Sequence, residues 1–181
     1  MGPIADLRHE HDIILLVLHA VERGAGSLQA TLDAEGDWLD TIIDFARGFV
    51  DQCHHGKEER HLFVRLEQRG IPNEGGPIGV MLSEHEQGRA FVRAIAEAAP
   101  GARNRDATAL ETAADGLLGY VELLRSHISK ENDVLFPMAD AVLTEQDRGE
   151  LEAAFERVEA EEMGEGVHER YHELAHRLAQ G

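Results

Sequence analysis

Apolar residues recur along the chain at intervals of three to four positions, which is the period of an α-helix. No stretch alternates apolar and polar residues for long enough to predict a sheet. Four long amphipathic segments joined by short loops predict an all-α fold, an up-down four-helix bundle. These segments cover about 3–32, 37–70, 78–98 and 107–136.

Glycine and proline mark the boundaries of the predicted helices. The stretch "RGAGS" at 23–27 weakens the first helix, which either breaks there or continues to about Leu32. "GIPNEGGP" at 70–77 and "APGARNRD" at 99–106 predict loops. Pro137 lacks an N–H donor, so we expect it to disturb the end of the fourth helix.

The C-terminal part of the chain predicts further helices outside the bundle. "TEQD" at 144–147 resembles a capping box with Asp in place of the usual Glu, and it predicts the start of a fifth helix. "GEG" at 164–166 separates a short sixth helix. We therefore expect a bundle over residues 1–140 and, packed on it, a helical extension over residues 141–181.

Composition and charge restrict the partners and the location. The 181 residues carry a formal net charge of −18, which argues against binding to nucleic acid or to anionic membrane surfaces. The longest apolar run, "IILLVL" at 13–18, is too short to span a bilayer, and no signal-peptide pattern opens the chain. A single cysteine, Cys53, cannot form an internal disulfide. We therefore expect a cytoplasmic protein.

A motif with metal-binding chemistry occurs twice. "HHGKEERHLF" at 54–63 and "HISKENDVLF" at 127–136 agree at five of ten positions. In each copy a His and a Glu four residues later share one helix face, where they can bind one metal ion. An isolated pair of this kind is more often a solvated surface pair. The two pairs are His54 with Glu58 and His127 with Glu131.

A second duplicated element strengthens the metal interpretation. "EHD" contains His11 and "EHE" contains His85, 74 residues later, while His127 follows His54 by 73 residues. The chain thus resembles two hairpins of one design, whose histidines and carboxylates converge near one end of the bundle. Six ligands exceed the four of a structural zinc site and predict two metal ions. Imidazole with carboxylate suits iron or manganese, with zinc and then copper as weaker fits.

In this order, "RHEHD", "HHGKEERHLF", "MLSEHEQGR" and "HISKENDVLFP" resemble the motifs of the hemerythrin-like domains, also called HHE cation-binding proteins. The resemblance covers about residues 4–137. It implies a four-helix bundle with two non-haem iron ions joined by an oxo or hydroxo bridge, manganese or zinc being weaker alternatives. Two carboxylates, those of Glu58 and Glu131, would bridge the ions. The ligands carried over by motif are His11, His54, Glu58, His85, His127 and Glu131.

The chain departs from the oxygen-carrying hemerythrins at two positions. They have a second His four residues after the third-helix His, where this chain has Arg89, and an Asp where it has Asn132. His55 with Glu59 also satisfies the spacing, but only the His54 register places Leu-Phe as in the second copy. Four His and two Glu resemble the hemerythrin-like proteins linked to nitric oxide stress, peroxide and iron-centre repair. A missing imidazole would open a coordination position, unless water or a residue outside the motifs fills it.

These features favour a di-iron protein that binds or reacts with O2, nitric oxide or peroxide. A sensing module without turnover, an iron storage or delivery protein, or an iron-centre repair protein would use the same ligands. Enzymatic activity is therefore left open, and so is any protein partner. The expected ligand is a small diatomic molecule or peroxide.

Other polar residues near the motifs have simpler explanations. Glu10 and Glu84 could hydrogen-bond to an imidazole, but a solvated acid is the commoner outcome. We expect Cys53 to be a small buried residue and Tyr120 a core tyrosine. A tail helix has three histidines on one face, tied by no motif to a carboxylate, and we expect Tyr171 to turn toward the bundle. These histidines are His168, His172 and His176.

Overall fold

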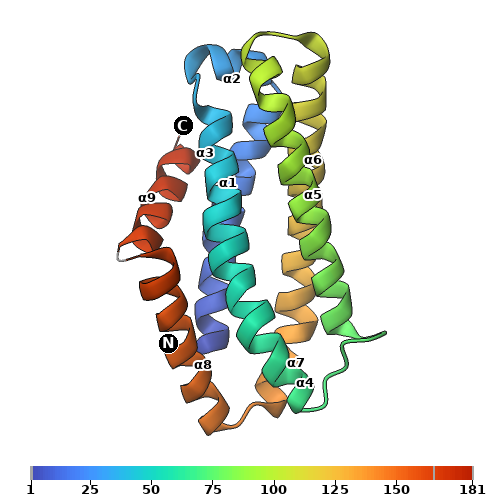
Figure 1. The fold of residues 1–181 in the computed structure, drawn as a ribbon, viewed down its shortest axis with the longest axis vertical. Helices are drawn as coiled ribbons and strands as arrows, with labels where there is room; N and C mark the ends of the chain where they lie inside the picture. The colour runs from blue at the N-terminus through green and yellow to red at the C-terminus, as the bar shows by residue number, and fades with distance from the viewer. Residues whose placement is uncertain (1, 165, 181) are drawn as a thin grey trace.

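The computed structural model describes residues 2–164 and 166–180, which form helices with no strand among them (Figure 1). The expected all-α bundle with additional C-terminal helices is confirmed. The bundle has four long helical segments, which we call arms. The first and third arms are α1 (Pro3–Ala25) and α5 (Pro77–Arg103). The second arm joins α3 (Trp38–Phe45), π-helices η1 (Ala46–His55) and η2 (Glu58–Leu62), and α4 (Phe63–Gln68). The fourth joins α6 (Ala107–Lys130), π-helix η3 (Glu131–Leu135) and α7 (Phe136–Val142).

The four arms stand side by side, and the C-terminal helices cover one flank of the bundle (Figure 1). α5 packs along α6, while α1 packs against both α6 and the last helix. The covering segment consists of α8 (Glu145–Arg157), π-helix η4 (Val158–Met163) and α9 (Val167–Gln180). The chain beyond the bundle therefore lies against the arm that contains His11.

The first helix breaks within "RGAGS". It ends at Ala25, and the short helix α2 (Leu28–Ala34) is bent by 103° from it. A Cβ atom at Gly24 would lie 2.4 Å from Cζ2 of Trp38, so this close approach needs glycine. Within the described part of the chain, no single helix combines the length and apolar character of a membrane crossing. α1 and α2 meet that test only as a bent pair.

Two predicted helix ends are wrong, because in both places a helix continues past a proline. α5 runs through Pro100 to Arg103, and it buries Ala99 and Ala102 against the core. Pro137 lies in the first turn of α7, where its missing N–H is not needed, and the fourth arm continues to Val142. The bundle arms are therefore longer than the sequence pattern predicts.

A capping box marks the start of the predicted fifth helix, and two glycines with positive φ mark the break after it. Thr144 and Asp147 form the capping box that begins α8. Asp147 also accepts hydrogen bonds at 2.8 and 2.9 Å from Arg69, the residue that follows α4, and these bonds fix α8 to the bundle. At the predicted break over 164–166, Gly164 and Gly166 have φ values of 95° and 74°, while Glu165 lies outside the described residues.

A layer of buried polar residues separates two apolar clusters inside the bundle. The larger cluster includes Phe49 and Leu124, and the smaller one includes Leu7 and Phe63. Of the ten buried polar or charged residues among those described, all but Asp147 belong to the layer between the clusters. Burying unpaired charges costs several kcal/mol each, so such a layer indicates a functional site.

Tyr171 turns toward the bundle, as expected, and holds α9 in place. Its hydroxyl donates a hydrogen bond of 3.1 Å to Oδ2 of Asp44, and a Cβ atom at Gly48 would lie 2.0 Å from that hydroxyl. Gly48→Ala should therefore displace Tyr171 and lower the free energy of unfolding by about 1–3 kcal/mol in urea denaturation. Gly149→Ala in α8, where an added Cβ atom meets nothing within 4 Å, is the matched control. Equal stability of the Gly48→Ala variant and the unchanged protein would contradict this packing.

Candidate metal centre

Seven of the nine side chains in the buried layer, from all four arms, offer atoms that could bind metal in its interior. Each is no more than 3% exposed. The first and third arms supply one His each, and the fourth supplies a His and a Glu. The second arm supplies two adjacent histidines and a Glu. The seven residues are His11, His54, His55, Glu58, His85, His127 and Glu131.

These side chains form two groups, and the possible ligand atoms within each group lie within 4.8 Å of one another. Glu58 belongs to both groups. Oε2 of Glu131 lies 3.1 Å from Nε2 of His11 and 3.3 Å from Nε2 of His127, so it also reaches both. Group one is His11, His54, Glu58 and Glu131, and group two is His55, Glu58, His85 and His127.

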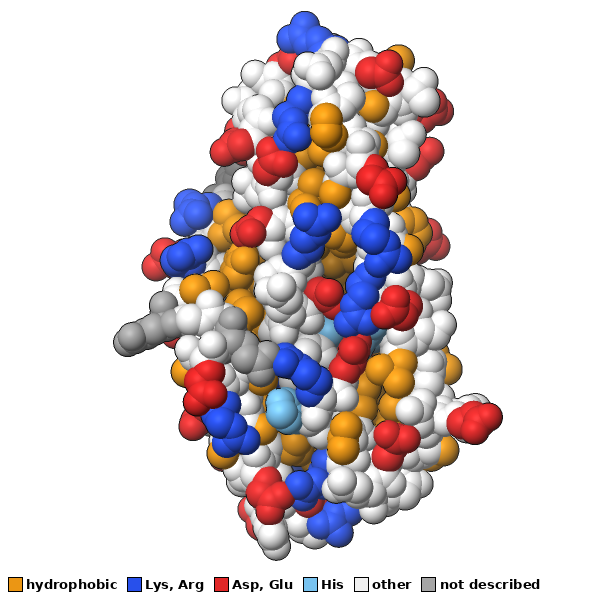
Figure 2. All heavy atoms as spheres, in the orientation of Figure 1, with side chains coloured by type: hydrophobic (Ala, Val, Ile, Leu, Met, Phe, Trp, Pro, Cys, Tyr) orange, Lys and Arg blue, Asp and Glu red, His pale blue; other side chains and the backbone are white. Residues whose placement is uncertain are grey.

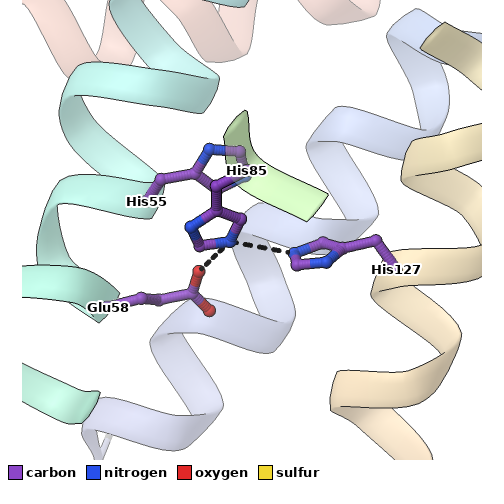
Figure 3. A group of neighbouring side chains, drawn as sticks. All are labelled: His55, Glu58, His85 and His127. Atoms are coloured by element: carbon purple, nitrogen blue, oxygen red, sulfur yellow. Dashed lines mark hydrogen bonds and ion pairs between the residues drawn. The ribbon is translucent and has the colours of Figure 1, made fainter. Parts of the chain in front are cut away.

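Figure 3 shows how group two converges from three arms. Nε2 of His85 lies 3.1 Å from Nε2 of His127 and 3.5 Å from Oε2 of Glu58. The ring of His55 stacks on that of His85, with centroids 3.7 Å apart and planes 13° from parallel. Possible ligand atoms of three imidazoles and one carboxylate thus lie within 4.8 Å of one another, close enough to bind one metal ion together.

The polar atoms of this layer fit bound cations. Several are buried without a hydrogen-bond partner among the described residues, although an unsatisfied buried polar group costs about 1–3 kcal/mol. Imidazole nitrogen and carboxylate oxygen are donors that iron, manganese and zinc accept. The unpartnered atoms are Nε2 of His11 and His54, Nδ1 of His55, and both carboxylate oxygens of Glu58 and Glu131.

Positive charge beside the two buried carboxylates stabilises their ionised forms. Burial, and then the charge of Glu131, raise the pKa of Glu58 well above its usual range. Burial acts likewise on Glu131, but the charges of His127 and His11, whose Nε2 atoms lie 3.3 and 3.1 Å from Oε2 of Glu131, outweigh it and hold the pKa of Glu131 well below its usual range. Burial lowers the pKa of His127, but Glu131 outweighs it and raises that pKa to about 9. Because metal ligands must lose their protons, metal binding here should release protons.

Comparison with known proteins agrees with this geometry. The family model of the hemerythrin HHE cation binding domain matches residues 2–139. This chain belongs to the hemerythrin HHE cation-binding family. Membership confirms the resemblance seen in the motifs and implies non-haem metal binding.

The curated relatives of this hemerythrin domain include two mycobacterial proteins. The uncharacterized proteins Rv1995 of Mycobacterium tuberculosis and Mb2018 of Mycobacterium bovis are each 26% identical to it over 160 residues. The alignment covers 88% of this chain and 62% of each relative, so the chain spans less than two thirds of their length. No solved structure matches the chain.

The structure of this hemerythrin domain brings all six motif residues together and adds a seventh, His55. The sequence pattern favours His54 over His55, because only the His54 register places Leu-Phe as in the second copy of the motif. In an α-helix, adjacent residues also point about 100° apart. Both histidines end π-helix η1, whose i→i+5 hydrogen bonds widen the turn and let both rings face the bundle. Group two therefore contains one imidazole beyond the four expected histidines, that of His55, which stands beside His54 in the first motif.

The two departures from the oxygen carriers have structural roles of their own. Arg89 does not enter the layer but pairs with Asp51 and Glu59 at 2.7 Å. Oδ1 of Asn132 lies 3.0 Å from Nδ1 of His11 and accepts its hydrogen bond. Although Arg89 takes the place of an imidazole of the oxygen carriers, group two still contains three imidazoles, because His55 lies there.

Carboxylates orient three further histidines. Nδ1 of His54 donates to Glu10 at 2.9 Å, and Nδ1 of His85 donates to Glu59 at 2.7 Å. Nδ1 of His127 donates to Glu84 at 3.0 Å. Such bonds leave Nε2 free for a metal ion and fix the ring. The expectation that Glu10 and Glu84 are solvated acids is wrong, because each reaches across its hairpin to the histidine of the other helix.

The pocket beside His55 brings solvent close to group two. It has a volume of about 310 Å³, lies between η1 and α5, and is lined by His55, Gly88, Arg89 and Tyr120, among others. Figure 2 shows histidine surface at the bottom of a hollow on this face, with basic side chains around it. Tyr120 is buried, as expected, and borders both this pocket and the larger apolar cluster.

If each group binds one metal ion, replacing His55 by Ala should reduce the number of bound ions from two to one. Group two would lose one of three imidazoles, whereas group one would keep all its side chains. Metal analysis after anaerobic loading and desalting measures the change, and His176→Ala, an exposed histidine of α9, is the control. Retention of two ions by the His55→Ala variant would show that His55 only packs against His85.

Proposed function

We propose that this protein holds two non-haem iron ions and binds or reacts with a small ligand such as O2, nitric oxide or peroxide. The observation that supports this most is the sharing of Glu58 between two buried groups of ligand atoms. Group one would be held by His11 and His54, and group two by His55, His85 and His127, with both carboxylates between them. Bound iron would supply one-electron redox chemistry and affinity for small oxygen and nitrogen ligands.

The two groups differ in a way that favours group one as the position for the added ligand. Group one has two imidazoles and group two has three, while the carboxylates reach both. Fewer protein donors leave more room for an external ligand. The ring of His11 stacks on Phe136, with centroids 5.3 Å apart and planes 9° from parallel. This apolar neighbour suits a small, weakly polar ligand.

The experiment is optical spectroscopy of ferrous-loaded protein during anaerobic addition of O2, nitric oxide or hydrogen peroxide. We expect at least one of them to produce a new absorption band, and we expect the band to be absent from the His11→Ala variant. A band that fades on degassing identifies reversible binding, and lasting conversion to a ferric spectrum identifies a reaction. Iron uptake without any response to the three ligands would instead favour storage or delivery and contradict the proposal.

A further inference from the structure

The two hairpins of the bundle carry the same arrangement around their histidines. In each, a Glu accepts a hydrogen bond from a histidine of the other helix and also pairs with a lysine three residues after that histidine. Glu10 pairs with His54 and Lys57, the lysine contact being 2.6 Å. The corresponding residues of the second hairpin are Glu84, His127 and Lys130.

The C-terminal extension breaks this symmetry. Nε2 of His168, on α9, donates a hydrogen bond of 3.0 Å to Oε1 of Glu10. Lys57 also pairs with Glu159 of η4 and is 1% exposed. In the second hairpin, Lys130 is 39% exposed, and no described residue beyond the bundle bonds to Glu84. Among the described residues, the C-terminal extension thus bonds to Glu10 and Lys57 beside group one, and not to the corresponding Glu84 and Lys130 beside group two.

The bonds to Glu10 form a continuous connection from α9 to a ligand of group one. Oε1 of Glu10 accepts from His168 and Lys57, and Oε2 accepts from His54. Glu10 is 2% exposed, so few waters can replace a lost donor. Its carboxylate is therefore held in one orientation, which in turn holds the ring of His54 with Nε2 toward group one.

A third metal ion beside Glu10 is a weaker explanation of these contacts. Possible ligand atoms of Glu10, Cys53 and His168 also lie within 4.8 Å of one another. However, the ammonium group of Lys57 already lies against Glu10 and supplies the positive charge. Burial also raises the pKa of the Cys53 thiol to about 12, and a thiol binds metals poorly compared with a thiolate.

We propose that His168 is a positioning residue of the metal centre: it orients Glu10, and through Glu10 the ligand His54, so that the C-terminal extension controls how tightly group one holds its ion. His168 lies outside residues 2–139, the part of the chain that the family model matches. The inference rests on the proposed two-metal centre. It adds that a residue of the C-terminal extension helps to hold a ligand of group one in place.

The test measures how fast a chelator removes iron in variants that retain one group. His55→Ala should retain an ion only at group one, and His11→Ala only at group two. In the His55→Ala background, His168→Ala should speed release about tenfold or more, since residues that orient a metal ligand typically contribute 10- to 100-fold to affinity. In the His11→Ala background, the same change should leave the release rate unaltered.

Two further variants separate positioning from general loosening of α9. His168→Gln keeps an N–H donor and should restore most of the slow release. Tyr171→Phe removes the hydrogen bond from α9 to Asp44 but leaves His168 in place, so it should not change release. Equal release rates with and without His168, or equal acceleration by Tyr171→Phe, would overturn the inference. Failure of the unchanged protein to bind two ions would instead overturn the proposed function.

Discussion

Replacing Glu58 by Gln should remove both metal ions at once. Glu58 is 0% exposed and is the residue that the two groups of ligand atoms have in common. Glutamine has nearly the same shape, but it loses the negative charge and replaces one oxygen with an NH2 group that cannot bind a cation. We expect the affinity at both positions to fall by at least about 100-fold, above the effect typical of residues that only orient a ligand. The iron content after anaerobic loading and desalting measures this loss.

Glu59→Gln is the matched control for this experiment. Glu59 is the neighbour of Glu58, and it also stands four residues after a histidine, His55. Its side chain is 24% exposed and accepts hydrogen bonds from His85 and Arg89. The Glu59→Gln variant should therefore keep two ions, although group two should hold its ion less tightly. Two ions in the Glu58→Gln variant would show that the carboxylates do not join the two groups.

Removal of the metal ions should lower the thermal stability of the protein strongly. The atoms of Glu58, Glu131, His11 and His54 that lack a hydrogen bond among the described residues would gain partners when cations are bound. An ion present at about 1,000 times its dissociation constant stabilises the folded state by about 4 kcal/mol. For a chain of this size, each kcal/mol moves the unfolding temperature by about 2–4 °C. Loading one position should thus raise the unfolding temperature by about 8–16 °C, and loading both should raise it further.

Differential scanning calorimetry with and without iron measures this shift. The His55→Ala variant should show a smaller increase than the unchanged protein, because it retains one position. The Glu58→Gln variant should show almost none. An unfolding temperature that does not change with iron would mean that the buried layer is satisfied without cations.

The sequence was sufficient for the parts of the fold that depend on periodicity and local caps. The helix spacing predicts the bundle, and Thr144 with Asp147 predicts the start of α8. It was insufficient where tertiary packing outweighs local preference. Because Ala99 and Ala102 are buried against the core, α5 continues through Pro100, although the sequence pattern around Pro100 predicts a loop.

The residues of the site also divide into those that the sequence pattern predicts and those that only the packing of the helices brings together. Spacing of four residues and the repeat of the motifs select six of the seven residues that form the two groups of possible ligand atoms. His55 also satisfies the spacing, with Glu59, but the register of the motifs favours His54 alone. The inward direction of both rings depends on a π-helix for which no sequence signal is evident. The bonds of Glu10 and His168 join positions 158 residues apart, so no local pattern could indicate them. Only the antiparallel packing of the arms and the return of α9 bring them together.

The number of iron ions per folded chain tests the central claim most directly. The unchanged protein should be loaded with ferrous iron without oxygen, desalted, and analysed for iron and protein, with circular dichroism to confirm the helical fold. The two groups joined by Glu58 and Glu131 predict two ions per chain. A folded protein that binds one ion or none would contradict the account.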